Sequence, residues 1–571
     1  MTNSARFPAT ALADDPAGRA PYPASRAWLR RLSLAVLLAA AAGFLALGLT
    51  EAWSDSPTFD EPVYVAAGLA AVLHHDLTFN DEHPPVPKVL AVLPVLLARP
   101  VVPANGRWAG NDEQKYSAAF LAAQLRAGRL RIVTFASRLV PLAESAGVAL
   151  AAYALGAELF GAAAGAVAGL LWLASPLVLG IGHLDGTDMP FALAVTLCSW
   201  ALARWLRLRS ALALVWTGLA MGAVAGTEIS GLLVVLASLA VIGWATWPSG
   251  ARRAWTSAAL AAGLTLLSLW VSYAVLDPSV LAQPTILVPR PYLDGIAFLA
   301  SYHSGGAQSY LAGVSYTGSR WWFWPVSLVI KFPAASLALL VAGPLAWCWT
   351  GRAARRRALL AVGMLAAPLA VFTIASPLNI GVRLLLPVIA LWAGAASAVV
   401  PAVAALRPPA RRAAGTALAA LLAAGAATTA LSFPGSLAWT APPFTPGYAA
   451  ATDSNIDWGQ GLYALQSWSL GRHPWVSYFG PRGLPAAAVP GGRPLLGTPP
   501  DRVSGWAAVS ATALNSADRP QLGWLRNYCP VGVLAGSILI YRFAEPPAAA
   551  PAPASPPPVC AGTRSSRPGQ R

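Results

Sequence analysis

Long apolar runs, separated by short segments rich in proline and arginine, dominate the hydropathy pattern of this chain. An α-helix needs about 20 mostly apolar residues to cross the hydrocarbon core of a bilayer. The pattern predicts eleven such spans, at residues 32–49, 134–156, 162–181, 189–204, 211–227, 229–247, 254–276, 321–348, 358–375, 382–405 and 412–432. We therefore expect an all-α polytopic membrane protein with about 11 transmembrane helices, or as many as 13.

Two further apolar stretches lie in the long loop after the first span. Residues 89–103 are short and bounded by prolines, and residues 117–130 carry Arg126 and Arg129 away from their apolar face. Short amphipathic stretches of this kind are typical of helices that lie in the membrane interface. This loop is therefore predicted to hold interfacial helices.

The positions of the arginines indicate how the chain is oriented in the membrane. Five arginine-rich segments fall between the spans, near residues 30–31, 204–209, 252–253, 352–357 and 407–412. Arginine and lysine are enriched in cytoplasmic loops. With eleven spans all five segments lie on one side, so we expect the loops 51–133, 182–188, 277–320 and 376–381 to lie outside a cytoplasmic membrane.

The pattern changes after residue 433. Short alternating runs such as "WVSYFG", "GWAAVSATAL" and "GSILIYRF" predict strands, with one helix after Trp458. We expect a membrane domain at 32–432 and a small extracytoplasmic α/β domain at 433–544. The segments 1–31 and 545–571 are predicted to be disordered tails, the first of them cytoplasmic.

Composition agrees with a membrane protein. The chain is 56% hydrophobic and 11% charged, whereas soluble domains carry about 25% charged residues. The net charge of +16 would suit a nucleic-acid partner, but the arginines sit in loops between spans, so we expect membrane lipids and no nucleic acid. Cys529 and Cys560 are candidates for a disulfide if both face an oxidising compartment.

The most acidic stretch, "SDSPTFDEPVY", follows the first span directly and holds Asp60 and Glu61. A carboxylate beside a membrane is costly unless it is paired or used in function. One carboxylate can take a proton from a hydroxyl as a general base, and a second can orient a polar substrate. The alternative is a solvated acidic loop.

Three basic residues are candidates for binding a phosphate. In "NDEHPPVPKVL" two prolines stiffen the backbone between His83 and Lys88, and "NIGVRLLLP" places Arg383 at the outer end of a span, where a positive charge calls for an anionic partner. Arginine and lysine both bind phosphate. The alternatives are a surface histidine, a lysine reaching along the interface and an ordinary headgroup contact.

Three more acidic residues lie in outer turns. Asp185 and Asp188 of "GHLDGTDMP" could join Asp60 around a divalent cation such as Mg²⁺ or Mn²⁺, although Asp188 could equally cap the following helix. Glu228 of "TEIS" is a functional candidate because it is ionisable beside a membrane; the alternative is a short exposed turn. A cation therefore stays open as a cofactor.

Several segments together resemble the lipid-phosphate-sugar-dependent glycosyltransferases of the GT-C fold, most of all the protein O-mannosyltransferase family (family 39) and the aminoarabinose transferases of lipid A. They include "TFDEPVY", "EHPPVPK", "NIGVRLLLP" and "DSNIDWGQGL", and the resemblance covers roughly residues 30–543. In the last segment, Asn455, Asp457, Trp458 and Gln460 are expected to position the outer domain over the site, or to serve only that domain's own structure.

The resemblance implies an inverting enzyme that takes a sugar from an undecaprenyl- or decaprenyl-phosphate donor on the outer face of the membrane. Asp60 would activate the acceptor, which could be a protein serine or threonine, a lipid or a cell-wall glycan. His83, Lys88 and Arg383 would bind the donor phosphate. Three departures are Glu228, where related chains often have lysine, Leu384, where they usually have tyrosine after the arginine, and Gly461, where they have an acid.

Two other functions stay open. A transporter or flippase of an amphipathic substrate would carry ionisable residues near the middle of the bilayer, whereas here they gather at its outer surface. A catalytically inactive relative could act as a membrane scaffold, and the reversed charge at Glu228 is compatible with this.

Overall fold

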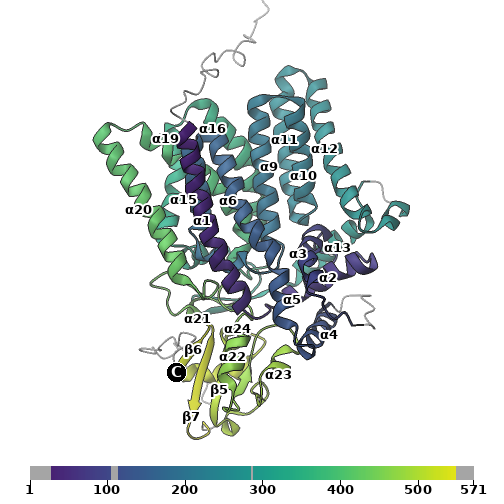
Figure 1. Cartoon of the computed structure of the whole chain (residues 1–571), viewed down its shortest axis with the longest axis vertical. Coiled ribbons are helices and arrows are strands. Elements are labelled where there is room, and N and C mark those ends of the chain that lie inside the picture. Colours follow the sequence, from purple (N-terminus) through teal and green to yellow (C-terminus); the bar gives the residue numbers. More distant parts are fainter. Residues whose placement is uncertain (1–26, 104–112, 284–286, 548–571) are drawn as a thin grey trace, which may run out of the picture.

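The structure is a computed structural model that describes residues 27–103, 113–283 and 287–547 (Figure 1). Most of both predicted tails, and Cys560 of the predicted disulfide, lie outside the described residues. Helix α1 (Ala27–Ser54) begins inside the segment that was predicted to be the N-terminal tail.

The protein is a mostly helical, multi-pass membrane protein. In the part of the chain that the structure covers, eight helices are long and apolar enough to cross a membrane, and a helix pair bent by 68° is a ninth candidate. Four of the eight are the single helices α1, α9 (Asp188–Leu208), α12 (Ala251–Ala274) and α20 (Pro408–Ser432). The other four are composite: α5 (Leu130–Ser137) with α6 (Leu139–Phe160), α11 (Leu232–Thr246) with its flanking turns, α16 (Arg352–Ala358) with α17 (Met364–Ala375), and α18 (Leu386–Ala396) with α19 (Val399–Ala404) and a preceding turn. The bent pair is α7 (Ala162–Leu173) and α8 (Pro176–Gly182).

Nine of the eleven predicted spans coincide with these helices and the bent pair, and the other two are shorter apolar helices. The predicted span 211–227 is the 15-residue helix α10 (Ala211–Ala225). The predicted span 321–348 is broken into α14 (Phe323–Lys331) and α15 (Ala334–Ala346), because Pro333 lacks a backbone N–H and Phe332 before it is extended. The bend between α7 and α8 has the same cause at Ser175 and Pro176.

The loop after α1 folds into three short helices. These are α2 (Glu61–His74), α3 (Pro85–Leu97) and α4 (Glu113–Arg126). Two of them lie where interfacial helices were predicted. A later loop, not predicted to have regular structure, holds α13 (Arg290–Gly305) and a hairpin of β1 (Gln308–Leu311) and β2 (Val314–Thr317). The α2 and α13 helices both contribute to the site described below.

The C-terminal region is a small mixed α/β unit, as predicted. Its five-stranded sheet has the order β4-β3-β5-β7-β6, with β3 parallel to β4 and β5 and the other pairs antiparallel. The strands are β3 (Trp475–Ser477), β4 (Arg493–Pro494), β5 (Gly505–Ser510), β6 (Gly532–Leu534) and β7 (Ile538–Phe543). Its helices are α21 (Gly447–Ala450), α22 (Leu462–Ser469), α23 (Leu484–Ala488) and α24 (Ala511–Asn515).

The sheet packs at one end of the helical bundle. The start of α1, together with α16 and α19, lies at the opposite end (Figure 1). The arginines at the start of α1 and in α16 therefore share one end of the molecule, which agrees with the predicted grouping. Which compartment each end faces stays a prediction.

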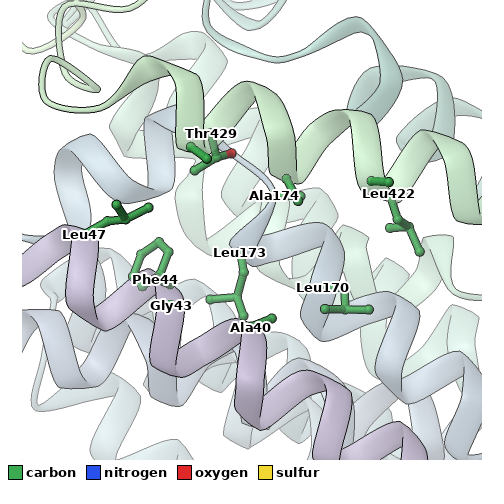
Figure 2. A pocket seen from close by; sticks show the side chains of 12 residues that line it. Ala40, Gly43, Phe44, Leu47, Leu170, Leu173, Ala174, Leu422 and Thr429 are labelled. Carbon is green, nitrogen blue, oxygen red and sulfur yellow. The ribbon is translucent and has the colours of Figure 1, made fainter.

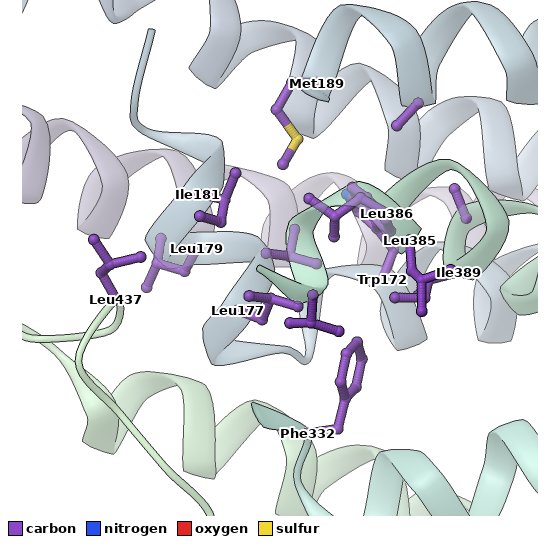
Figure 3. Close-up of a cluster of buried hydrophobic side chains, with 14 of the residues drawn as sticks. Trp172, Leu177, Leu179, Ile181, Met189, Phe332, Leu385, Leu386, Ile389 and Leu437 are labelled. Carbon is purple, nitrogen blue, oxygen red and sulfur yellow. The ribbon is translucent and has the colours of Figure 1, made fainter. Parts of the chain in front are cut away.

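A large apolar core fixes the helix ends that face the C-terminal region. Trp172 of α7, Leu177 of α8, Met189 of α9 and Phe332 are buried together (Figure 3). Leu385 and Leu386, two and three residues after the candidate residue Arg383, belong to the same cluster. The packing thus anchors the backbone that carries the candidate site.

Candidate active site

Three charged side chains from distant parts of the chain meet where the helices face the C-terminal region. Arg383 lies at the start of the turn Val382–Leu385, Asp60 directly precedes α2, and Asp188 is the first residue of α9. Arg383 Nη1 lies 2.9 Å from Asp188 Oδ2, and its Nη2 lies 3.4 Å from Asp60 Oδ2. The Asp60 side chain keeps 27% of its surface exposed, against 8% for Arg383. Asp60 is therefore the accessible member of the group.

Residues of the C-terminal region also contact Arg383. The guanidinium carbon lies 4.3 Å from the centre of the Trp458 ring, within the range of a cation–π contact. Arg383 Nε donates to Ser454 Oγ at 3.2 Å, and the neighbouring Val382 N–H donates to Asn455 Oδ1 at 3.0 Å. The arginine is thus fixed between the two parts of the molecule.

The carboxylate of Asp60 is less acidic than usual. Burial raises its pKa, and the nearby Arg383 and His83 offset this only in part. A raised pKa makes a carboxylate a stronger base, which suits proton abstraction from a hydroxyl.

Glu61, although adjacent in sequence, faces a different partner. Its two oxygens lie 2.7 Å from Arg138 Nε and Nη2, and they also accept from the N–H groups of Thr58 (2.7 Å) and Asp185 (2.8 Å). Burial raises the pKa of Glu61, but Arg138 outweighs burial and the pKa is lowered. The predicted contact of Glu61 with a substrate stays untested, and the observed contacts hold the acidic loop.

Arg138 is a site-supporting residue that the sequence analysis missed. Its guanidinium is fully buried and also donates to the carbonyls of Ala52, Asp55 and Ser56 at 2.8–2.9 Å. A charged residue inside a predicted apolar span is itself a signal of function or of a buried partner. That signal was present in the span 134–156.

His83 and Glu228 form an ion pair beside this group. His83 Nδ1 lies 3.1 Å from Glu228 Oε1, which also accepts from Thr187 Oγ1 at 2.5 Å. Burial lowers the pKa of His83, but Glu228 outweighs burial and the pKa is raised. Tyr64 packs edge-on against the His83 ring. Glu228 is thus part of the buried site and does not lie in an exposed turn.

Lys88 is directed at backbone oxygens. Its Nζ donates to Asn80 O at 2.5 Å, His83 O at 2.7 Å and Asn80 Oδ1 at 3.2 Å. Three acceptors match the three hydrogens of an ammonium group, and burial lowers the Lys88 pKa to about 8. Lys88 fixes the loop that carries His83, and its predicted contact with phosphate stays a prediction.

The residues proposed to bind a cation do not form one cluster. Asp188 pairs with Arg383, while the Asp185 N–H donates to Glu61 and Asp185 Oδ2 is buried without a partner among the described residues. Burial keeps the Asp185 pKa well above its usual range. Within the described segments, no group of three or more His, Cys, Asp or Glu side chains is arranged to hold a metal.

The segment 453–460 joins the C-terminal sheet to the acidic loop. Asp457 Oδ2 accepts from the Thr512 N–H at 2.8 Å, and Gln460 uses its side chain to close the turn around Trp458. The backbone carbonyls of Trp458 and Gln460 accept from Phe59 N and Ser56 N at 2.9 and 3.0 Å. The turn therefore contacts Arg383 and is bonded to the acidic loop next to Asp60.

A cavity of about 610 Å³ opens beside the charged group. His83, Asp188 and Glu228 form its polar end. Most of its wall is apolar and comes from α9, α11, α13, α17 and α18, with residues such as Phe191, Leu232, Leu299, Phe372 and Pro387. This shape suits a ligand with a polar head and a long apolar tail.

A second pocket, of about 320 Å³, lies between α1, α7 and α20 (Figure 2). Its lining is apolar apart from Thr429, whose hydroxyl donates to Gly425 O. Among the described residues no charged side chain lines it, and it is separate from the candidate site.

No protein-family model matches the chain, and no curated protein matches it either. Among solved structures it is similar to ArnT from Cupriavidus metallidurans bound to undecaprenyl phosphate, with 21% identity over 75% of this chain and 69% of that chain and a TM-score of 0.43. It is also similar to the archaeal oligosaccharyltransferase AglB from Archaeoglobus fulgidus in complex with an inhibitory peptide and a dolichol-phosphate, with 12% identity over 87% and 72% and a TM-score of 0.45.

Proposed function

We propose that this chain is an integral-membrane glycosyltransferase that moves a sugar from a polyprenyl-phosphate donor to an acceptor hydroxyl. One observation carries the proposal: an accessible carboxylate, Asp60, is paired with Arg383 beside an apolar cavity of about 610 Å³ whose polar end holds His83. The cavity offers room for part of a polyprenyl tail, and the charged group supplies a base and two cations.

The reaction follows from these groups. Asp60 takes the proton of the acceptor hydroxyl as the acceptor oxygen bonds to the anomeric carbon of the sugar. The bond between that carbon and the phosphate oxygen breaks, and its electron pair leaves with the polyprenyl phosphate. Arg383 and His83 stabilise the negative charge that develops on the phosphate. Attack opposite the leaving phosphate inverts the configuration at the anomeric carbon.

The remaining predicted residues support this geometry. Glu61 holds the loop that carries Asp60 through Arg138, and Lys88 holds the loop that carries His83. Asn455, Asp457, Trp458 and Gln460 keep the C-terminal region against Arg383. We place the site on the outer face of the cytoplasmic membrane, and the acceptor is a protein hydroxyl, a lipid or a glycan.

The test is sugar transfer by the purified full-length protein from undecaprenyl-phosphate mannose, glucose or arabinose to a crude acceptor extract. Asp60→Asn should reduce transfer by at least about a hundredfold, the usual contribution of a general base. Asp501→Asn, a matched change at an exposed site in the C-terminal region, should leave it unaltered. Equal transfer by Asp60→Asn and wild type would remove Asp60 from the mechanism. A parallel assay with EDTA decides whether a divalent cation is required.

A further inference from the structure

The two carboxylate oxygens of Glu228 have different surroundings in the described part of the chain, and one of them is unused there. Thr187 Oγ1 and His83 Nδ1 both contact Oε1, at 2.5 and 3.1 Å. No donor among the described residues reaches Oε2. The side chain is 16% exposed and lines the cavity, so its free surface faces the space where a ligand would bind.

A carboxylate in this position restricts which chemical groups of a ligand can lie next to it. A carboxylate oxygen that faces the cavity can accept hydrogen bonds from a ligand, and an anion placed against it would be repelled. The phosphate of a donor lipid must therefore lie toward Arg383 and His83, away from Glu228 Oε2. A neutral hydrogen-bond donor is the group that fits beside this oxygen.

The other acidic group of the cavity is already neutralised. Asp188, at the same polar end, lies 2.9 Å from Arg383 Nη1. The wall beyond this end is mostly apolar. The unused oxygen of Glu228 therefore lies where the polar head of a bound lipid would end.

We propose that Glu228 Oε2 accepts a hydrogen bond from a hydroxyl of the donor sugar, so that Glu228 helps to select the sugar that is transferred. The inference rests on the proposed function and extends it to the head group of the donor. It assigns the phosphate to Arg383 and His83 and the sugar to Glu228.

The experiment compares two lipids on the purified full-length protein: undecaprenyl phosphate without sugar, and the undecaprenyl-phosphate sugar that supports transfer. Glu228→Gln should weaken binding of the sugar-bearing lipid about tenfold to a hundredfold, the range of a hydrogen bond to a charged group. Binding of plain undecaprenyl phosphate should change by less than about threefold, because the loss of repulsion between Glu228 and the phosphate is offset by the weaker support of a protonated His83.

Glu158→Gln is the matched control. Glu158 pairs with Arg207 near the end of α9, about 30 Å along that helix from Asp188, and its replacement should affect neither lipid. Equal weakening of both lipids in Glu228→Gln would mean that Glu228 acts only through His83, which overturns this inference and leaves the glycosyltransferase proposal intact. Failure of the wild type to bind undecaprenyl phosphate would overturn both.

Deoxy sugars give the same information without a mutation, in case Glu228→Gln unfolds. One singly deoxygenated donor should bind the wild type about tenfold to a hundredfold more weakly than the parent donor does. If every deoxy donor binds the wild type as tightly as the parent sugar, Glu228 contacts no hydroxyl and the inference is wrong.

Discussion

At the scale of single residues, Arg383 is shared unequally between two carboxylates. Its contact with Asp188 is 2.9 Å long, whereas its contact with Asp60 is 3.4 Å long. Asp188 also raises the pKa of Asp60 directly, although burial is the largest contribution. In the proposed reaction, this arrangement would leave Asp60 basic enough to accept a proton while Arg383 stays in place for the phosphate.

The contact of Arg383 with both carboxylates predicts how the pH dependence of kcat/KM changes in the Asp188→Asn variant. Asp60 acts as a base only when it is ionised, so transfer should fall as the pH drops through its pKa. Removing the negative charge of Asp188 removes a contribution that raises this pKa. The acidic limb of kcat/KM against pH should therefore move to lower pH. A limb that stays in place or moves upward would contradict the role of Asp60; Asp501→Asn is the control.

Glu61 illustrates the other use of a buried carboxylate at this site. It forms a two-point contact with Arg138, and both side chains are nearly inaccessible, at 2% and 0% exposure. Breaking one half of a buried pair leaves an uncompensated charge and costs about 3–5 kcal/mol. The pair is therefore expected to matter for the stability of the acidic loop.

Glu61→Gln should lower the free energy of unfolding by roughly 3 kcal/mol, because Arg138 would lose its buried counter-charge. Thermal unfolding of the purified protein in detergent measures the effect. Asp294→Asn breaks an exposed pair with Arg290 and should cost less than about 1 kcal/mol. Equal stability of Glu61→Gln and Asp294→Asn would show that the buried pair contributes no more than a surface pair.

At the scale of elements, close packing of α13 against the loop before α3 shapes one side of the cavity. Gly295 of α13 lies so near the backbone oxygen of Asp81 that a Cβ there would clash with it. A backbone atom cannot move aside as a flexible side chain can. The distance between α13 and the loop that carries His83 therefore depends on this glycine.

Gly295→Ala should push α13 away from the loop and raise the KM for the lipid donor by about tenfold or more. Gly305→Ala, in the same helix but with open space around its Cβ, should leave KM unaltered and supplies the control for helix propensity. Transfer rates measured over a range of donor concentrations give the KM of each variant. An unchanged KM in Gly295→Ala would show that this contact does not shape the cavity.

Elements were easier to predict from the sequence than their contacts. Hydropathy located the long helices because each buries its own backbone hydrogen bonds in an apolar run. It missed the breaks at Ser175 and Pro333, where a local proline effect overrides an unbroken apolar pattern. The sequence also identified Asp60, His83 and Arg383 as candidate site residues. It could not show that the Lys88 ammonium group donates to carbonyl oxygens, since side-chain partners depend on tertiary packing.

At the scale of the whole molecule, the C-terminal region takes part in the site. Its turn at 453–460 places Trp458 against Arg383 and accepts backbone hydrogen bonds from Ser56 and Phe59 of the acidic loop. The same turn is bonded to the sheet region through Asp457 and Thr512. Displacement of the C-terminal region would therefore disturb the charged group.

Trp458→Leu tests this coupling, because it keeps an apolar side chain but removes the aromatic face beneath Arg383. A desolvated cation–π contact is worth about 2 kcal/mol, so kcat/KM for transfer should fall roughly thirtyfold. Trp468→Leu removes a similar contact with the exposed Arg472, which lies in the C-terminal region away from the charged group, and should leave transfer within about twofold of wild type. Thermal unfolding of both variants shows whether a loss of transfer comes from the missing contact with Arg383 or from unfolding of the protein. If both variants retain full transfer while folded, the C-terminal region does not position Arg383; a loss confined to Trp458→Leu means that the two parts of the chain build one site.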